Sequence, residues 1–125
     1  MVSVPQIHRL RRGRMHPSMR ALLAETSLSV NDLILPLFIH HDSNAKHPIH
    51  SMPGQYQLGI QHLPETLDRI TGLGIKSVIL FGVHERKDAH GSASWDENGV
   101  VQTAMRGIRK QSPDRLIIAD DCCCQ

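Results

Sequence analysis

Three short apolar runs, separated by two stretches with helical periodicity, constrain the fold of this chain more than any other feature. The runs are Leu33–Ile39, Val78–Phe81 and Leu116–Ile118. Near-continuous apolar runs of this length are typical of strands that are buried in a parallel sheet. Between them, His62–Leu73 and Gly99–Lys110 repeat apolar residues every three to four positions. The alternation of strand and helix predicts an α/β fold with parallel strands and right-handed crossovers.

The apolar positions define the expected inner face of each helix. These positions are Leu63, Leu67, Ile70 and Leu73 in the first helix, and Val100, Val101, Ala104, Met105 and Ile108 in the second. Gly72 and Gly74 are expected to close the first helix. A shorter helix is predicted from Pro17 to about Thr26, with Met19, Leu22 and Leu23 on one face. Pro36 removes a ladder donor, so its strand is expected at a sheet edge or with a bulge.

The predicted sheet is incomplete. Its third strand leads directly into the candidate site described below, and no helix follows that would cover this strand. A chain of 125 residues is at most one ordinary domain. An eight-stranded barrel takes about 250 residues. The chain is therefore either a small open α/β domain or the leading part of a larger barrel. We divide it into a basic N-terminal arm, residues 1–16, and the first βα units of a truncated barrel domain, residues 17–125.

Charge is distributed unevenly along the chain. Residues 1–20 carry five arginines and no acid, whereas the remaining residues carry 9 bases and 12 acids. No aromatic residue is interleaved for base stacking, so nucleic acid is not the expected partner of the arm. A solvated arm or one that contacts another subunit is expected instead. No apolar run approaches the roughly 20 residues of a membrane helix, and the crowded cysteines suit the reducing cytoplasm.

Asp120 and three consecutive cysteines follow directly on the last apolar run. In an extended chain, Cys122 and Cys124 point to one side and Cys123 to the other. Two thiolates on one side can share a zinc ion, although two further ligands would be needed for a tetrahedral site. From spacing alone, reduced and partly buried thiols are the commoner outcome.

The segment from His40 to Gly54 is polar and is predicted to be a long loop. Its four histidines, His40, His41, His47 and His50, suggest a metal site. No pair of them has ligand spacing on a predicted helix, and solvent-exposed loop histidines are the expected outcome.

The chain resembles the porphobilinogen synthase (δ-aminolevulinic acid dehydratase) family from about Arg9 to Cys124. The matching segments, whose order and spacing are together specific, are Arg9–Arg12, Leu28–Phe38, Ser51–Gly54 with Tyr56, Leu73–Ile75, Leu80–Val83, Lys87–Asp88, Gly91–Ser92, Trp95, Asn98–Gln102 and Asp120–Cys124. The resemblance implies a TIM-like barrel, with an N-terminal arm that embraces a neighbouring subunit in a homo-oligomer, an octamer in the family. It implies an enzyme that condenses two molecules of 5-aminolevulinate into porphobilinogen, in the biosynthesis of tetrapyrroles and haem.

By the same resemblance, Cys122 and Cys124 are zinc ligands, because an Asp-x-Cys-x-Cys strand end supplies two of three thiolates in the zinc-dependent branch. The metal would polarise a substrate carbonyl or hold a bound hydroxide. The family's third cysteine and both Schiff-base lysines lie beyond Gln125. The four lysines present, Lys46, Lys76, Lys87 and Lys110, match neither lysine, so no catalytic lysine is assigned. Asp121 and Cys123 depart from the family pattern.

We therefore expect the N-terminal part of a zinc-type porphobilinogen synthase that is inactive by itself. Two other classes stay open. One is a non-enzymatic assembly module, which docks through its arm and open sheet edge. The other is a small zinc- or thiol-binding domain.

Overall fold

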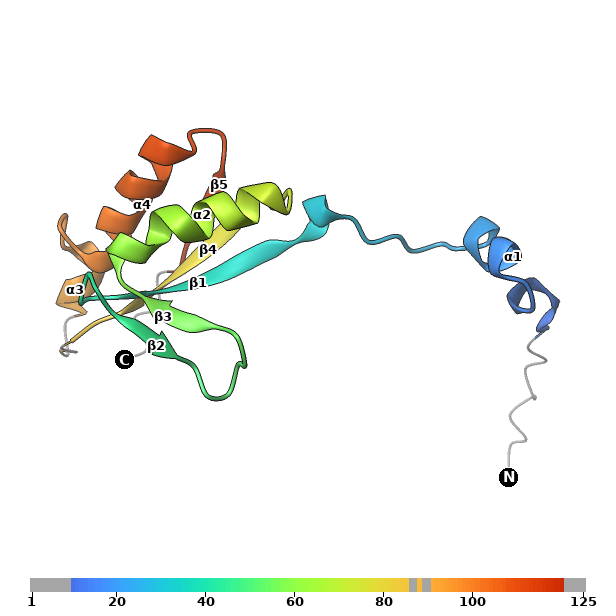
Figure 1. The fold of residues 1–125 in the computed structure, drawn as a ribbon, viewed down its shortest axis with the longest axis horizontal. Helices are drawn as coiled ribbons and strands as arrows, with labels where there is room; N and C mark the ends of the chain where they lie inside the picture. Colours follow the sequence, from blue (N-terminus) through green and yellow to red (C-terminus); the bar gives the residue numbers. More distant parts are fainter. Residues whose placement is uncertain (1–9, 86–87, 89–90, 121–125) are drawn as a thin grey trace, which may run out of the picture.

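The computed structural model describes residues 10–85, 88 and 91–120, and centres on one five-stranded sheet (Figure 1). The strands are β1 (Ile34–His40), β2 (Lys46–Pro48), β3 (Tyr56–Leu58), β4 (Ser77–Val83) and β5 (Leu116–Ala119), in the spatial order β2-β3-β1-β4-β5. Strands β3, β1, β4 and β5 are parallel, and only β2 pairs antiparallel. The predicted α/β class with parallel strands is confirmed.

The prediction of a long loop over residues 40–54 is partly wrong. This segment contains β2, and β3 comes after the segment. β2 pairs with β3 as an antiparallel hairpin, and β3 adds to β1 with Phe38 opposite Gln57 and Ile39 opposite Leu58. β2 and β3 have only three residues each. Strands this short show no measurable periodicity, so their pairing could be found only in the folded chain.

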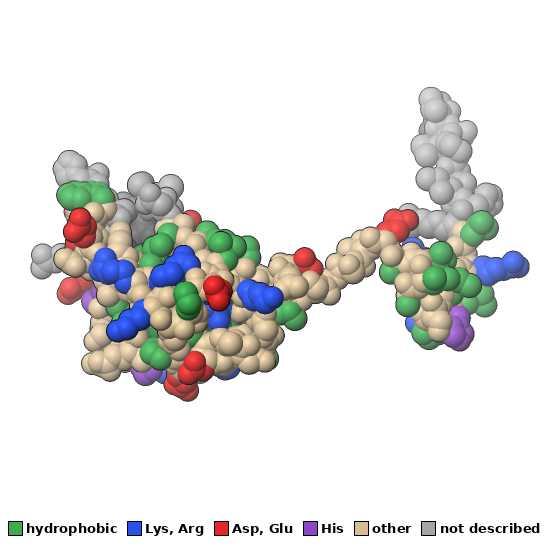
Figure 2. All heavy atoms as spheres, turned by 90° about the horizontal axis from the view of Figure 1, so that it is seen from above, with side chains coloured by type: hydrophobic (Ala, Val, Ile, Leu, Met, Phe, Trp, Pro, Cys, Tyr) green, Lys and Arg blue, Asp and Glu red, His purple; other side chains and the backbone are tan. Residues whose placement is uncertain are grey.

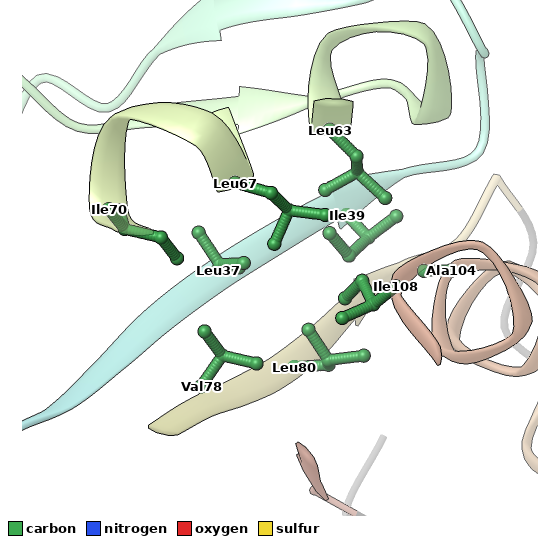
Figure 3. Close-up of a cluster of buried hydrophobic side chains, with 9 residues drawn as sticks. All are labelled: Leu37, Ile39, Leu63, Leu67, Ile70, Val78, Leu80, Ala104 and Ile108. Carbon is green, nitrogen blue, oxygen red and sulfur yellow. The ribbon is translucent and has the colours of Figure 1, made fainter. Parts of the chain in front are cut away.

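Two helices, α2 (Leu63–Gly72) and α4 (Val100–Gln111), cover one face of the sheet. Their buried side chains meet alternate residues of β1 and β4 in one core cluster (Figure 3), whose members are Leu37, Ile39, Leu63, Leu67, Ile70, Val78, Leu80, Ala104 and Ile108. The predicted inner faces are confirmed except at Leu73, which follows α2 and is 63% exposed. No helix in the described part of the chain is long and apolar enough to cross a membrane.

Short helical turns fill the connections. The 3-10 helix η3 (Ile60–His62) leads into α2, and the four-residue α3 (Ser92–Trp95) precedes α4. These turns move the chain from the carboxyl end of a strand to the start of the next helix, as βα connections do.

Pro36 lies at a position of β1 that needs no ladder donor. β1 pairs with β4 along its whole length, whereas β3 reaches β1 only at Phe38 and Ile39. The amide of His41 donates to Val83 at 3.1 Å, and alternate amides of a parallel strand face the same neighbour. The nitrogen of Pro36 therefore faces away from β4, on the side where β3 has not begun. The prediction of a sheet edge or a bulge is wrong, because β1 is the central strand and pairs with β4 without interruption.

The N-terminal segment stands away from the sheet. It contains η1 (Arg12–Arg14), α1 (Pro17–Leu22) and η2 (Val30–Asp32). Figures 1 and 2 show α1 separated from the sheet by an extended stretch. The helix predicted to reach Thr26 ends at Leu22, and its apolar face is exposed, with Leu22 at 78%. The division of the chain at residue 16 stays a prediction.

Candidate functional site

The carboxyl ends of β1, β4 and β5 lie side by side at one edge of the sheet. Strands β1 and β4 end together at His40 and Val83, which are register partners. The amide of Asp120 donates to Leu80 at 3.1 Å, which extends the β4–β5 ladder one residue past β5. Ligand sites of parallel α/β sheets lie at this edge, because the strand ends and the following loops gather there.

The predicted zinc ligands, Cys122 and Cys124, lie outside the described residues. They follow Asp120, whose backbone hydrogen bond places it beside β4. The described residues contain no group of three or more His, Cys, Asp or Glu side chains that could hold a metal ion.

The sheet face opposite the helices is apolar. Alternation along β1, β4 and β5 places eight apolar side chains on it, together with Ser77 and His40. All eight are half-buried or exposed: Ile34, Pro36, Phe38, Ile79, Phe81, Val83, Leu116 and Ile118. The rings of Phe38 and Phe81 stack with centroids 5.4 Å apart, which joins β1 to β4 on this face. A face of this kind is suited to covering by further protein.

Three of the loop histidines gather at the end of β1. The ring centroid of His40 lies 4.2 Å from that of His41 and 5.1 Å from that of His47. Burial lowers the pKa of His40, and the neighbouring His41 and His47 lower it further, whereas Asp42 raises it. Sequence spacing missed this cluster, because only the β2–β3 hairpin brings His47 back to His40. His50 is exposed.

The lysines lie at different places in the fold. Lys46 is in β2, with its Nζ 5.6 Å from the ring centroid of Tyr56. Lys76 precedes β4, at the amino edge of the sheet and therefore away from the strand ends described above. Lys110 is exposed on α4, and Lys87 lies outside the described residues.

A shallow cavity of about 460 Å³ lies between α4 and β5. It is lined by Met105, Arg106, Arg109, Lys110 and Ile117. Arg109 donates to the backbone oxygen of Pro113 at 2.7 Å, which closes the turn that leads into β5. The cavity thus lies on the helix-covered side of the sheet, whereas the thiols follow its carboxyl edge.

Known proteins match this chain along most of its length. A family model described as delta-aminolevulinic acid dehydratase matches residues 7–125. The delta-aminolevulinic acid dehydratase of Helicobacter pylori is 46% identical over 118 residues, which are 94% of this chain and 36% of that protein. The corresponding protein of Halalkalibacterium halodurans is 43% identical over 117 residues, again 94% of this chain and 36% of the relative.

A solved structure matches the fold as well. It is the delta-aminolevulinic acid dehydratase (porphobilinogen synthase) of Toxoplasma gondii in complex with the reaction product porphobilinogen, with a TM-score of 0.81 at 32% identity. The match covers 93% of this chain and 33% of the Toxoplasma gondii chain. The chain therefore spans about a third of the length of these relatives.

Proposed function

The chain belongs to the delta-aminolevulinic acid dehydratase family, and on that premise we propose that it supplies the first βα units of a lyase that condenses two 5-aminolevulinate molecules to porphobilinogen. One observation carries the proposal: the family match extends through Asp120 and the terminal cysteines, to residue 125. The parallel strands β1, β4 and β5 supply a carboxyl edge of the kind at which active sites of such folds are built.

Cys122 and Cys124 would hold a zinc ion in this enzyme. Thiolates are soft ligands that suit zinc, and the spacing of the two cysteines puts both sulfurs on one side of an extended chain. When bound, zinc supplies a Lewis acid that polarises a carbonyl oxygen. The residue that precedes this segment in the described part of the chain, Asp120, is held beside β4 by its backbone hydrogen bond to Leu80.

The chain by itself should not catalyse the condensation. A Schiff base needs a lysine amine at the reacting carbonyl, but Lys76 precedes β4 at the opposite edge of the sheet and Lys110 lies exposed on α4. We expect no porphobilinogen when the purified chain is given 5-aminolevulinate and Zn²⁺ and pyrrole is measured colorimetrically. Turnover by the chain alone would contradict this.

A chimera gives the positive test. Residues 1–125 replace the matched segment of the Helicobacter pylori relative, which supplies the remaining two-thirds of the protein. We expect the chimera to form porphobilinogen. Cys122→Ser and Cys124→Ser should each lower bound zinc and reduce activity by more than about tenfold, because a ligand of the Lewis acid is lost. Cys123→Ser is the matched control and should keep both zinc and activity.

Two results would count against this function. One is a folded, zinc-loaded chimera that makes no porphobilinogen while the Helicobacter pylori parent does. The other is a Cys122→Ser chimera as active as the Cys123→Ser control. If the isolated chain instead retains stoichiometric zinc that Cys122→Ser abolishes, a small zinc-binding domain is favoured.

The N-terminal arm is proposed to contact a second subunit in a homo-oligomer of the cytoplasm. Its support is the exposure of apolar side chains on the arm, with Leu10 at 89% and Met15 at 79%. The same exposure also favours the assembly module, which would dock on complete subunits. Size-exclusion chromatography of the chimera with and without residues 1–16 tests the arm. An unchanged oligomer after deletion would exclude it as a subunit contact.

A further inference from the structure

The turn that follows β1 depends on an unprotonated ring nitrogen of His40. The amide of Asp42 donates to Nδ1 of His40 at 3.0 Å. Asp42 accepts the next two hydrogen bonds of the turn. The amide of Asn44 donates to Oδ1 of Asp42 at 2.9 Å, and the amide of Ala45 donates to the backbone oxygen of Asp42 at 3.1 Å. A proton on Nδ1 of His40 would face the amide of Asp42 and remove the first bond, because both groups would then be donors.

His40 also meets the hairpin directly. Its ring lies against His41 in a tilted stack and against His47 of β2 edge-on. A charge on His40 therefore opposes a charge on either of the other two rings, since the separations of 4.2 Å and 5.1 Å between ring centroids are well within one Debye length of about 8 Å.

The other charged groups around the cluster come from three elements. Asp42, in the turn, favours the protonated form of His40. Lys46 of β2 lies over Tyr56 of β3, and His84 follows β4 with its Nε2 close to Gly82. The net effect of desolvation and the two histidines outweighs Asp42, so the pKa of His40 falls below its ordinary value of 6.5.

We propose that His40, His41 and His47 form a proton-operated latch, which holds the β2–β3 hairpin (residues 46–58) to the carboxyl end of β1 when neutral and releases it when protonated. The direction of the pH effect on the latch follows from the pKa of His40, which is lower in the folded chain than in the unfolded chain. The unfolded chain therefore binds the proton more readily. The latch is fully formed above pH 6.5 and weakens as pH falls through that value toward the pKa of the folded chain.

Hydrogen–deuterium exchange of the full chain between pH 7.5 and 5.0 tests the latch, with rates corrected for the intrinsic effect of pH and with EDTA present. In the wild type, the amides of residues 42–47 should lose protection as pH falls. The loss is at most about tenfold per pH unit, the limit for one linked proton. The strand β4 ends at the same edge of the sheet as β1. The protection of its amides should change little with pH, so these amides serve as the internal reference.

Three variants separate the latch from a general effect of acid. His40→Gln keeps an acceptor but cannot titrate, so its protection of residues 42–47 should not depend on pH. His47→Gln removes one source of repulsion, which brings the pKa of His40 in the folded chain nearer to its ordinary value. The loss of protection on acidification should therefore be smaller than in the wild type, a difference that stays measurable even if His40→Gln folds poorly. His50→Gln, an exposed histidine on the same hairpin connection, should behave as the wild type.

The latch is overturned if protection of residues 42–47 is independent of pH in the wild type. It is equally overturned if His40→Gln keeps the full pH dependence, if His47→Gln loses as much protection as the wild type, or if His50→Gln removes the dependence. None of these outcomes depends on enzymatic activity, so the latch and the proposed function succeed or fail separately.

Discussion

Gly74 decides how α2 is joined to β4. Its φ of 77° lies in the left-handed region, which costs a residue with a Cβ about 1–2 kcal/mol. In this conformation the amide of Gly74 donates to Thr71 at 2.9 Å, and the amide of Ile75 donates to Ile70 at 3.0 Å. The chain then turns directly into β4. The sequence indicated that Gly72 and Gly74 close the helix, and the structure assigns the turn itself to Gly74.

Gly74→Ala should therefore lower the free energy of unfolding by about 1 kcal/mol. Gly72→Ala is the matched control, because Gly72 is the last residue of α2 and an added Cβ would have no heavy atom within 4 Å. It should raise the free energy of unfolding by up to about 1 kcal/mol. Urea unfolding at equal protein concentration measures both. Equal effects of the two substitutions would rule out the role of the positive φ.

Arg115 shows what sequence reasoning did not detect in a single residue. It precedes β5 and is only 7% exposed. Its guanidinium donates to the backbone oxygen of Ile75 at 2.5 Å and to Oγ1 of Thr71 at 2.7 Å. These bonds tie the start of β5 to the end of α2, about 40 residues earlier in the chain. Burial of an arginine depends on acceptors brought together by folding, so no local pattern could indicate it.

Among the helices and strands, those with an apolar run or a helical period were predictable, including the four-residue β5. Those with neither were not. α2, α4, β1 and β4 each bury alternate or every third to fourth residue in the core cluster. β2, β3 and α3 have three or four residues each, and β2 consists of Lys46, His47 and Pro48. Such elements form because neighbouring strands offer hydrogen-bonding partners, which is a property of the sheet and not of the segment.

The packing of α4 on the sheet should depend on Ile108, which is fully buried between the helix and the strands. Ile108→Ala should lower the free energy of unfolding by about 2–5 kcal/mol, through lost burial and the cavity left behind. Lys110→Ala, two residues along the same helix and exposed, should change it by less than about 0.5 kcal/mol. Thermal or urea unfolding distinguishes them. An Ile108→Ala chain as stable as Lys110→Ala would contradict the described packing of α4.

At the scale of the whole molecule, no helix among the described residues covers the second side of the sheet. Both sheet-packing helices among the described residues lie on the other face (Figure 3). At the amino ends of β1 and β5, Ile34 and Leu116 of the apolar face are 50% and 57% exposed. Apolar area of this kind promotes association when nothing covers it. We therefore expect the isolated chain to form soluble aggregates or a partly ordered state, and a sharp cooperative transition from a monomer would contradict this.

Replacing Ile34 and Leu116 with lysine should shift the isolated chain toward monomer, because two charges would lie on the apolar face. Leu73→Lys is the control: Leu73 is similarly exposed, at 63%, but follows α2 on the other side of the sheet. Light scattering after size-exclusion chromatography gives the mass of each variant. A Leu73→Lys chain that dissociates as fully as the double variant would show that added charge, and not this face, controls association.

The sequence by itself determined the strand–helix alternation, the parallel sheet and the inner faces of its helices. Burial of one face makes apolar residues recur every second position in a strand and about every 3.6 positions in a helix, and this pattern can be recognised in the sequence. Its motifs also indicated the family. Only the tertiary structure decided that β1 lies at the centre of five strands, that the hairpin brings His47 to His40, and that Arg115 is buried against α2. These features depend on contacts between residues far apart in the chain, whose partners and geometry exist only after the sheet has formed.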